Sequence, residues 1–457
     1  MTYFKPSNYN HFLYLENEDK YLVYNAISNG LAKLEPEIYR LIKDGQQSFL
    51  NLHDSKENAD IIKELYRGHI LIDNDLDEFE MLHTKFNMTK YFQRVLSLTI
   101  VTTLDCNLNC TYCYEGYRGD RYADEDLENK IVDFAADKIL SMDYKFLHIT
   151  WYGGEPLLNK DFIYSLSRKL LALCKSHDVN YGAMIVTNGT LLTRTIVQQL
   201  KRYKVGSMQI TIDGPQEIHD KRRPLKNPKK SSYQLIVNNI KRIFGLIPIQ
   251  IRVNVDKTNI TKTLPLLDEF EKFGWLARSR DIFVYIGFTK EWTSNCSNIT
   301  PNCFSMREFS EAEIEFQRLL ISKGYNALNL YPNLTSYCVA ISPHGFVIDP
   351  GGELHKCWSD VGNKDAYFGN VREPIKLNKK LLDWLSFDPL THLPECKDCR
   401  FFPICGGGCP YVPIRQKEKL KNDDVYNCTP WRMFLEEKMK LFMQDKAMKL
   451  KQTNKGG

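Results

Sequence analysis

The stretch that decides the fold is the loop Cys106-Asn107-Leu108-Asn109-Cys110-Thr111-Tyr112-Cys113, which spaces three cysteines as C-x-x-x-C-x-x-C. Three thiolates at this spacing can bind three irons of a 4Fe-4S cube from one loop. The fourth iron then has no protein ligand, and such an open metal position is where a small molecule binds. A zinc site is the alternative, but zinc knuckles pair C-x-x-C with further ligands nearby, and this loop lacks the fourth ligand. The loop therefore predicts an iron–sulfur cluster with one open iron.

The loop lies within a regular alternation of strand and helix patterns. Short apolar segments are expected as strands at 95–102, 146–152, 183–187, 207–213, 249–255 and 282–288. Amphipathic segments between them are expected as helices at 124–141, 160–177, 194–203, 232–244 and 264–273. This alternation is typical of parallel strands joined by crossover helices. Six such steps are too few to close an eight-stranded barrel, so we expect an open, partial (β/α)6 barrel of the α/β class, with its site where the strands end.

The composition limits what kind of protein this can be. The chain has 457 residues, 43% of them hydrophobic, which excludes disorder and predicts two or three domains. Its net charge of +5 is too small for the cationic surface of a nucleic-acid binder. No apolar run reaches the roughly eighteen residues that span a bilayer, and the first residues do not resemble a signal peptide. The thirteen cysteines are therefore expected to be reduced, metal-binding thiols of a cytoplasmic protein that binds neither nucleic acid nor membrane.

Residues from about 10 to 85 form a first unit with a different pattern. The expected strands are 11–15, 21–24 and 31–34, and the expected helices are 36–42 and 58–66. The first two strands flank Glu16-Asn17-Glu18-Asp19, a hairpin signal. The unit closes with an apolar segment at 70–72 and an acidic run at 73–80. Three strands followed by two helices predict a small winged-helix-like module, and an ordinary cap on the next domain is the alternative.

A second group of cysteines lies in the C-terminal part. It consists of Cys338, Cys357, Cys396, Cys399, Cys405, Cys409 and Cys428. The segment that carries them is rich in glycine and proline and cannot build much core alone, so bound metal is expected to cross-link it. A pair of structural zinc ribbons is the alternative interpretation of these spacings. Beyond the last cysteine, residues 432–451 are expected as a basic helix.

With Tyr112 directly before its last cysteine, the first loop is similar to the signature of the radical S-adenosylmethionine (SAM) enzymes. The resemblance implies that the three cysteines bind a 4Fe-4S cluster, that SAM chelates its open iron, and that Tyr112 packs near the adenine. It further implies that one electron cleaves SAM to methionine and a 5′-deoxyadenosyl radical, which abstracts a hydrogen atom from the substrate. That chemistry belongs to the cofactor, and the protein positions it.

Later motifs resemble the same family at the ends of successive strands. Trp151-Tyr152-Gly153-Gly154-Glu155-Pro156 is similar to the family's GGEP motif, in which glycines let backbone carbonyls approach the SAM ammonium and the glutamate offers a carboxylate to it. Thr187-Asn188-Gly189-Thr190 and the segment 213–223 resemble stretches that face the SAM ribose and carboxylate. Asn254 is a weaker candidate, with a buried structural role as the alternative. The implied SAM contacts are Tyr112, Gly153, Gly154, Glu155, Pro156, Asn188, Asp213, Arg223 and Asn254.

The spacing of the seven C-terminal cysteines is similar to the SPASM extension of peptide-modifying radical SAM enzymes, as is Phe368-Gly369-Asn370-Val371. The resemblance implies two auxiliary 4Fe-4S clusters with interleaved ligands. One would be held by Cys396, Cys399, Cys405 and Cys428, and the other by Cys338, Cys357 and Cys409. The second set is one ligand short, because the position of a relative's fourth cysteine is Pro332 here. Either Cys296 or Cys303 completes it, or one iron stays open for a substrate thiolate or a non-cysteine ligand.

The first unit resembles a RiPP recognition element, the leader-binding module of ribosomal peptide maturases, chiefly in Tyr21-Leu22-Val23-Tyr24 and Leu31-Ala32-Lys33-Leu34-Glu35-Pro36. Such a module binds the leader by β-augmentation, in which the peptide adds as a strand to an exposed sheet edge. The expected domains are a recognition element at 1–90, a radical SAM barrel at 91–290, a bridging segment at 291–335, a SPASM domain at 336–435 and a basic helix and tail at 436–457.

These resemblances imply a peptide maturase that forms intramolecular thioether cross-links, of the ranthipeptide or sactipeptide type, in a ribosomally made precursor peptide. A donor such as flavodoxin or ferredoxin would supply electrons. A carbon–carbon cross-linking maturase shares every motif quoted and stays an alternative. A sulfatase maturase, which makes formylglycine, is less favoured: in that family an aspartate base follows the cysteine matching Cys357, whereas Trp358 follows here and Asp360 lies two further on. A non-catalytic electron carrier would not need the Gly-Gly-Glu-Pro loop.

Overall fold

Six parallel strands form the centre of the structure. They are β6 (Val95–Val101), β7 (Phe146–Tyr152), β8 (Asn180–Thr187), β9 (Val205–Thr211), β10 (Ile249–Val255) and β11 (Ile282–Phe288). Each pairs in parallel with the next along the chain. The crossover helices are α5 (Glu125–Ser141), α6 (Lys160–Ser176), α7 (Arg194–Arg202), α9 (Ser232–Ile243) and α10 (Thr263–Lys272). The predicted α/β alternation is therefore confirmed, with strand ends that differ from the predicted ones by three residues or fewer.

The computed structural model describes residues 4–44, 56–115, 119–276, 281–291, 294–325, 338–417, 428 and 430–453. Helix α5 shows why the barrel segments fold as the sequence predicts. The side chain of Asp124 accepts a hydrogen bond from the backbone of Leu127 and caps the first turn, which stabilises a helix by about 1 kcal/mol. Ile131, Phe134 and Ile139 are buried in one core with the strands, and each such side chain contributes about 1.5–3 kcal/mol.

The barrel sheet continues into the C-terminal part of the chain. β12 (Gly345–Ile348) lies parallel to β6, and β13 (Glu353–His355) and β14 (Gly369–Asn370) follow antiparallel to their neighbours. The sheet order is β11-β10-β9-β8-β7-β6-β12-β13-β14, with nine strands among the described residues. The expected six strands undercount it because β12, β13 and β14 lie outside the regular strand–helix alternation. As a result, Cys357 lies close to the barrel, two residues after β13.

Before the C-terminal cysteine region, helices α4, α8 and α11 lie in segments for which the sequence predicted none. The end of the acidic run at 73–80 starts α4 (Glu78–Tyr91), and the expected polar loop after β9 contains α8 (Gln216–Arg222). The expected bridging segment at 291–335 contains α11 (Met306–Ser322). Ser305 and Glu308 form a capping box at its start, a helix signal that is visible in the sequence.

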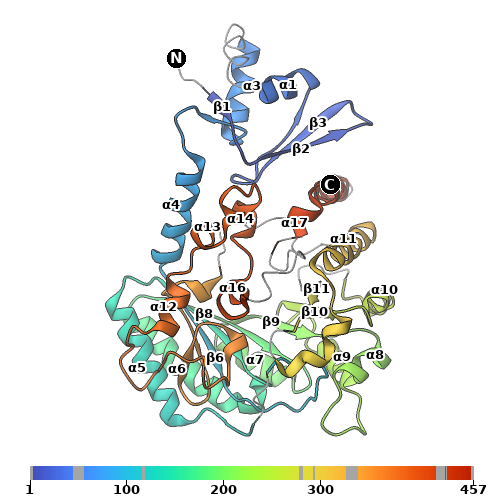
Figure 1. The fold of residues 1–457 in the computed structure, drawn as a ribbon. Coiled ribbons are helices and arrows are strands. Elements are labelled where there is room, and N and C mark those ends of the chain that lie inside the picture. The colour runs from blue at the N-terminus through green and yellow to red at the C-terminus, as the bar shows by residue number, and fades with distance from the viewer. Residues whose placement is uncertain are drawn as a thin grey trace.

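The N-terminal unit has the predicted order of strands and helices. β2 (Asn10–Leu15), β3 (Lys20–Asn25) and β4 (Leu31–Leu34) form an antiparallel sheet, followed by α1 (Pro36–Asp44) and α3 (Lys56–Arg67). β1 (Phe4–Pro6) pairs with β5 (Leu71–Asp73), an added two-stranded sheet. Val23 and Leu34 pack with Ile42 of α1 and Leu65 of α3 on one face. Figure 1 shows this unit above the large sheet, with α4 running between them.

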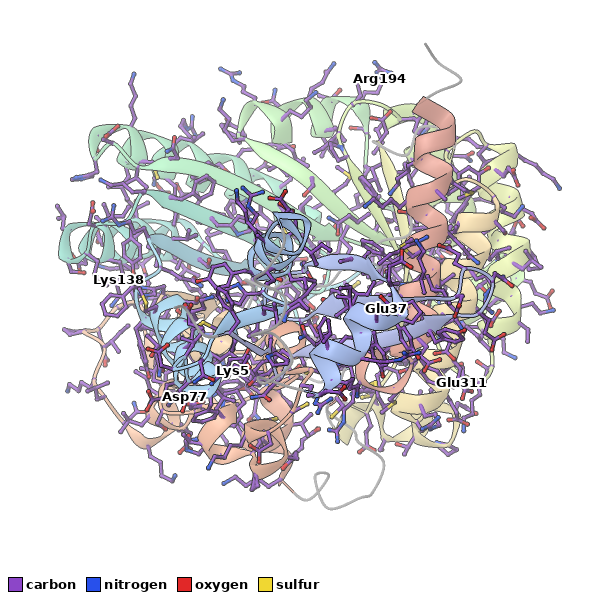
Figure 2. The ribbon with its side chains drawn as sticks, turned by 90° about the horizontal axis from the view of Figure 1, so that it is seen from above. Lys5, Glu37, Asp77, Lys138, Arg194 and Glu311 are labelled. Carbon is purple, nitrogen blue, oxygen red and sulfur yellow. The ribbon has the colours of Figure 1, made fainter. Side chains whose placement is uncertain are left out.

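The C-terminal elements pack against both other parts. Short helices α12 (Lys379–Leu385), α13 (Pro389–His392), α14 (Pro394–Lys397), α15 (Phe402–Cys405) and α16 (Tyr411–Arg415) lead to α17 (Pro430–Met433) and α18 (Leu435–Thr453). The predicted helix at 432–451 is thus divided at Phe434. Met439 of α18 packs with Leu13 and Leu22 on the second face of the N-terminal sheet, and Figure 2 shows α18 beside that sheet from above. Among the described residues, no helix combines the length and apolarity that crossing a bilayer requires.

Candidate active site

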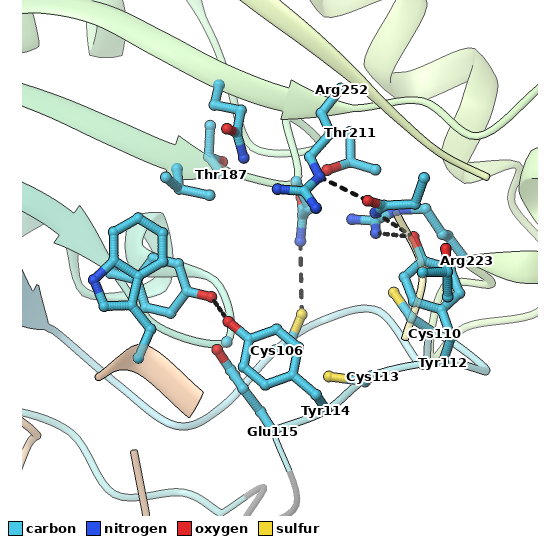
Figure 3. A pocket seen from close by; sticks show the side chains of 18 of the residues that line it. Cys106, Cys110, Tyr112, Cys113, Tyr114, Glu115, Thr187, Thr211, Arg223 and Arg252 are labelled. Carbon is cyan, nitrogen blue, oxygen red and sulfur yellow. Dashed lines mark hydrogen bonds between the residues drawn. The ribbon is translucent and has the colours of Figure 1, made fainter. Parts of the chain in front are cut away.

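A pocket opens where the parallel strands end and their loops begin (Figure 3). The predicted residues that line it are Cys106, Cys110, Tyr112, Cys113, Gly153, Gly154, Asn188, Arg223 and Asn254. They come from five different loops and strands, and the parallel topology brings them to one edge of the sheet. Glu155, Pro156 and Asp213 were predicted to contact SAM as well, but they are buried and do not line this pocket.

The donor set of the three-cysteine loop fits an iron–sulfur cluster. The Cys106 sulfur accepts hydrogen bonds from the backbone N–H of Leu108 at 3.4 Å and from Nδ2 of Asn188 at 3.7 Å. Such N–H···S bonds stabilise a metal-bound thiolate and tune its cluster. Without metal, burial raises the pKa of the Cys106 thiol to about 12, and the nearby Glu155 carboxylate adds to the effect. Metal binding is therefore what would hold this sulfur as a thiolate.

The described side chains include no group of three His, Cys, Asp or Glu that could hold one metal ion. The ligands of a 4Fe-4S cube bind separate irons, so they stand apart by the width of the cluster rather than meeting at one point. Cys106, Cys110 and Cys113 line one pocket in this separated way. The residues present therefore fit the cluster that the loop predicts.

The two glycines of the Gly-Gly-Glu-Pro loop are required by close packing against the cysteine loop. A Cβ atom on Gly153 would lie 2.4 Å from the Thr103 carbonyl oxygen, and one on Gly154 would lie 2.3 Å from that of Asp105. Gly153 also has φ of +139°, which side chains disfavour. The backbone N–H of Gly154 donates to the Thr103 oxygen at 3.1 Å. The loop thereby fixes the position of the chain just before Cys106.

Glu155 has a different environment from the predicted one. Its carboxylate is fully buried and accepts hydrogen bonds from Thr187 Oγ1 at 2.7 Å, from the Asn188 backbone at 2.7 Å and from the Leu157 backbone at 3.1 Å. Burial raises the pKa of this carboxyl group, and the three donors oppose that rise. In this arrangement Glu155 holds the loop that presents Asn188 to the pocket. A SAM contact by Glu155 stays a prediction, for which one lone pair of Oε2 is left.

The hydroxyl of Tyr112 is the centre of a polar network behind the cysteine loop. It donates to Asp213 Oδ2 at 2.6 Å and accepts from Arg223 Nη1 at 2.7 Å and from Asn254 Nδ2 at 3.1 Å. Asp213 also pairs with Arg222 at 3.3 Å, deep in the core. The hydroxyl thus makes one donated and two accepted hydrogen bonds, which hold it in place. The Tyr112 ring is therefore a fixed wall of the pocket. Asp213 therefore supports the site from behind.

Sequence reasoning missed several residues that line the pocket. They are Tyr114, Glu115, Val186, Gln209, Thr211, Arg252, Phe288, Thr289, Lys290 and Trp358. Tyr152 and Thr187 also line it; they belong to quoted motifs but were not named as contacts. The alternation on two strands could have found some of them: Gln209 and Thr211 on β9, and Arg252 and Asn254 on β10, are polar residues two apart, so they point to one face of the sheet. Trp358 had no such signal, because its position depends on how the C-terminal region folds onto the barrel.

In the first set of C-terminal cysteines, neighbouring thiols raise one another's pKa. Burial is the main cause that raises the pKa of Cys396 to about 12. Nearby negative charges add to this effect, in the order Cys405, Cys399, Glu395 and Cys428. Burial and then Cys428 raise the pKa of Cys405 to about 11. Since such effects act only between near neighbours, Cys396, Cys399, Cys405 and Cys428 form one group.

The cysteines of a second set also raise one another's pKa. Burial, followed by the charges of Asp360, Cys338 and Cys409, raises the pKa of Cys357 well above its usual value. Burial and then Cys409 raise the pKa of Cys338 to about 11. Cys357 and Cys409 pack against the same hydrophobic cluster as Cys396 and Cys399, so the two sets lie near each other. That each of these groups holds an auxiliary cluster stays a prediction.

The fourth ligand of the second set has two cysteine candidates with other partners. The Cys296 thiol is fully buried and donates to the carbonyl of Lys290 at 3.7 Å. The Cys303 thiol donates to the Ile299 carbonyl at 3.5 Å, and burial, Asp256 and Cys296 raise its pKa. Pro332, the position of a relative's cysteine, lies outside the described residues.

Comparison with known proteins identifies the barrel. Residues 100–260 match the model of the Radical SAM superfamily. Two curated relatives are an uncharacterized protein of Methanocaldococcus jannaschii, 33% identical over 38% of this chain and 57% of its own length, and the radical SAM cyclopropyl synthase TigE of Paramaledivibacter caminithermalis, 29% identical over 49% and 53%. The chain thus spans about half the length of these relatives. A cysteine-type anaerobic sulfatase-maturating enzyme of Clostridium novyi is 24% identical over 73% of this chain and 92% of its own.

Solved structures share the fold. anSMEcpe with bound AdoMet and Cp18Cys peptide has a TM-score of 0.58 at 16% identity, covering 78% of this chain and 99% of that one. Streptococcus suis SuiB bound to S-adenosylmethionine has a TM-score of 0.51 at 16% identity, covering 93% and 99%. Residues 100–260 of the present chain form a radical SAM domain.

Proposed function

We propose that this radical SAM enzyme matures a ribosomally made precursor peptide by forming thioether cross-links between a cysteine sulfur and a carbon of an acceptor residue. One observation carries the proposal: Trp358, the residue after Cys357, lines the same pocket as Cys106, Cys110 and Cys113. A peptide in this pocket would touch the SAM loop on one side and the wall next to an auxiliary-cluster ligand on the other. The peptide seen with anSMEcpe supports a peptide substrate here.

The residues of the pocket wall are held in place from behind. The Trp358 ring lies 4.7 Å from the Tyr152 ring, and its Nε1–H donates to Thr99 Oγ1 at 3.1 Å. The hydroxyl groups of Tyr114 and Tyr152 are hydrogen-bonded to each other. This aromatic wall would orient the peptide and exclude water from a reactive intermediate.

When bound, the cluster and SAM would supply the 5′-deoxyadenosyl radical that takes a hydrogen atom from the acceptor carbon. The peptide thiol would lose its proton as its sulfur bonds to that carbon, and the remaining electron would leave toward the Cys338, Cys357 and Cys409 side. In total the peptide loses two hydrogens for each cross-link. A flavodoxin or ferredoxin would supply the electron that starts the reaction.

The local structure around Cys357 favours cross-linking over formylglycine formation. Trp358, not an acid, extends from the cluster side into the pocket. Asp360 is buried, pairs with Arg415 at 3.4 Å and does not line the pocket. No carboxylate on this segment is therefore placed to take a proton from a bound peptide. The likeness to the Clostridium novyi enzyme makes formylglycine the second outcome to measure.

The N-terminal unit is proposed to bind the leader of the precursor. In the described chain, β4 pairs only with β3, so its outer edge offers unpaired N–H and C=O groups. α1 and α3 pack on one face of this sheet and α18 on the other, which leaves the edge as the place where a strand can add. We accordingly propose the recognition element at 1–90, the barrel at 91–290, the bridging segment at 291–335, the SPASM domain at 336–435 and the basic helix and tail at 436–457.

The proposal is tested by mass spectrometry of the precursor encoded beside the gene. After anaerobic reconstitution with iron and sulfide, the enzyme receives SAM, a reductant and the peptide, and the product is treated with iodoacetamide. We expect the loss of two hydrogens per site together with one cysteine that no longer reacts. A loss of two hydrogens with every cysteine still reactive indicates a carbon–carbon bond, as the likeness to TigE would suggest. Conversion of a cysteine to an aldehyde indicates formylglycine, and either result overturns the thioether.

A further inference from the structure

Arg252 lies at the base of the pocket, on the strand face that points into the barrel. Along β10 the residues alternate: Ile251 and Val253 are fully buried in the core, whereas Arg252 and Asn254 line the pocket. Figure 3 shows the Arg252 guanidinium pointing into the pocket near Thr211. Its Nε donates to Asn254 Oδ1 at 2.7 Å. This bond fixes the plane of the guanidinium, which also hydrogen-bonds the Tyr285 side chain and points into the cavity.

The neighbouring strand is shaped to accept this side chain. A Cβ atom on Gly287 of β11 would lie 2.4 Å from Arg252 Nε and 2.8 Å from Nη2. Gly287 pairs with Asn254 in the sheet register, so the glycine lies directly beside the residue that accepts the hydrogen bond from Arg252. Tyr285, two residues earlier, donates its hydroxyl to Gln209 Oε1 at 2.7 Å and forms a further side of the same recess. The absence of a side chain at 287 thus makes room for the guanidinium.

The charge of Arg252 has no carboxylate partner in the described part of the chain, where every ion pair involves other residues. A guanidinium inside a pocket is costly unless an anion faces it, and its planar fork matches a carboxylate with two parallel hydrogen bonds. The described lining residues carry three cations, Arg223, Arg252 and Lys290, and one carboxylate, Glu115. SAM brings a single carboxylate, and Arg223 is its expected partner.

We propose that Arg252 forms a carboxylate-binding subsite for the peptide substrate, so that the enzyme prefers an acidic group next to the position it modifies. This inference rests on the proposed peptide maturase function and adds a substrate preference to it. The carboxylate can come from an aspartate or glutamate side chain or from a free peptide C-terminus, because both present the same two oxygens.

The test compares binding of three small probes to the reconstituted, SAM-loaded enzyme by saturation-transfer NMR. The probes are N-acetyl-aspartate α-amide, N-acetyl-asparagine α-amide and N-acetyl-glycine. We expect the aspartate probe to bind the wild type at least about tenfold more tightly than the asparagine probe, as for one charge-assisted pair. Arg252→Gln should remove that difference, and Arg252→Lys should restore only part of it because lysine lacks the fork. N-acetyl-glycine binding as tightly as the aspartate probe would assign the subsite to a C-terminus.

Arg202→Gln is the matched control, because Arg202 is an exposed arginine on α7 and its loss should leave all three affinities unchanged. Equal binding of the aspartate and asparagine probes to the wild type would overturn the proposal. So would an Arg252→Gln enzyme whose main defect is a higher KM for SAM in peptide-free SAM cleavage, since Arg252 would then hold the SAM carboxylate. Probe binding through Arg252 without any change in the precursor would contradict the maturase function and leave the carboxylate subsite standing.

Discussion

Replacing Cys106, Cys110 and Cys113 together by alanine is expected to abolish the cleavage of SAM to 5′-deoxyadenosine. The three sulfurs line the pocket, and without them no thiolate is left among the described residues that line it to hold a cluster. Bound iron should fall by about a third, one cluster of three, if both C-terminal groups bind theirs. 5′-Deoxyadenosine is measured by liquid chromatography after anaerobic reconstitution, and iron by a colorimetric assay on the same sample.

The control for this variant is Cys174→Ala. Cys174 is buried in the apolar core on α6, so its loss removes a sulfur without touching any of the three proposed cluster sites. We expect a loss of stability of about 1 kcal/mol and an unchanged iron content. The radical SAM account fails if the triple variant, shown by circular dichroism to be folded, still releases 5′-deoxyadenosine at the wild-type rate.

The grouping of the C-terminal cysteines predicts a pattern of iron losses that is not additive. Cys396→Ala and Cys405→Ala each remove a ligand from the same group, so the double variant should lose no more iron than either single one. Cys357→Ala acts on the other group, and combining it with Cys396→Ala should lose twice as much. Substitutions at independent sites add their effects, whereas those in one unit do not.

Two measurements keep this result interpretable. Cleavage of SAM without peptide should persist in all these variants, because the loop from Cys106 to Cys113 is intact, and this shows that the barrel is folded and loaded. Cross-linking of the precursor should be lost in each. An additive iron loss for Cys396→Ala with Cys405→Ala, or a single loss for Cys396→Ala with Cys357→Ala, would mean that the ligands are divided differently.

The sequence predicted the barrel well because its signals are local. Each strand is a short apolar run, and helices such as α5 combine a capping aspartate with a buried stripe. The cysteine loop is equally local, since spacing alone limits what three thiolates can bind. β12 escaped prediction because its place beside β6 depends on contacts between residues about 250 apart in the sequence.

The site residues also divide into those that a local motif predicts and those that only the folded chain brings to the pocket. Tyr112, Asn188 and Arg223 belong to recognisable motifs, and they line the pocket. Glu155 also belongs to a motif, but its three hydrogen-bond donors come from residues whose positions only the folded backbone fixes. Arg252 and Trp358 belong to no motif. They face the pocket because of strand alternation and because the C-terminal region packs onto β6.

The most direct test of the central claim is the fate of a deuterium atom. The precursor peptide is synthesised with its carbon-bound hydrogens replaced by deuterium, the reconstituted enzyme is given SAM and a reductant, and the 5′-deoxyadenosine is analysed by mass spectrometry. We predict that 5′-deoxyadenosine carries one deuterium and that its amount matches the number of cross-links formed. Cross-linked peptide accompanied by unlabelled 5′-deoxyadenosine would contradict hydrogen abstraction from the peptide in this pocket.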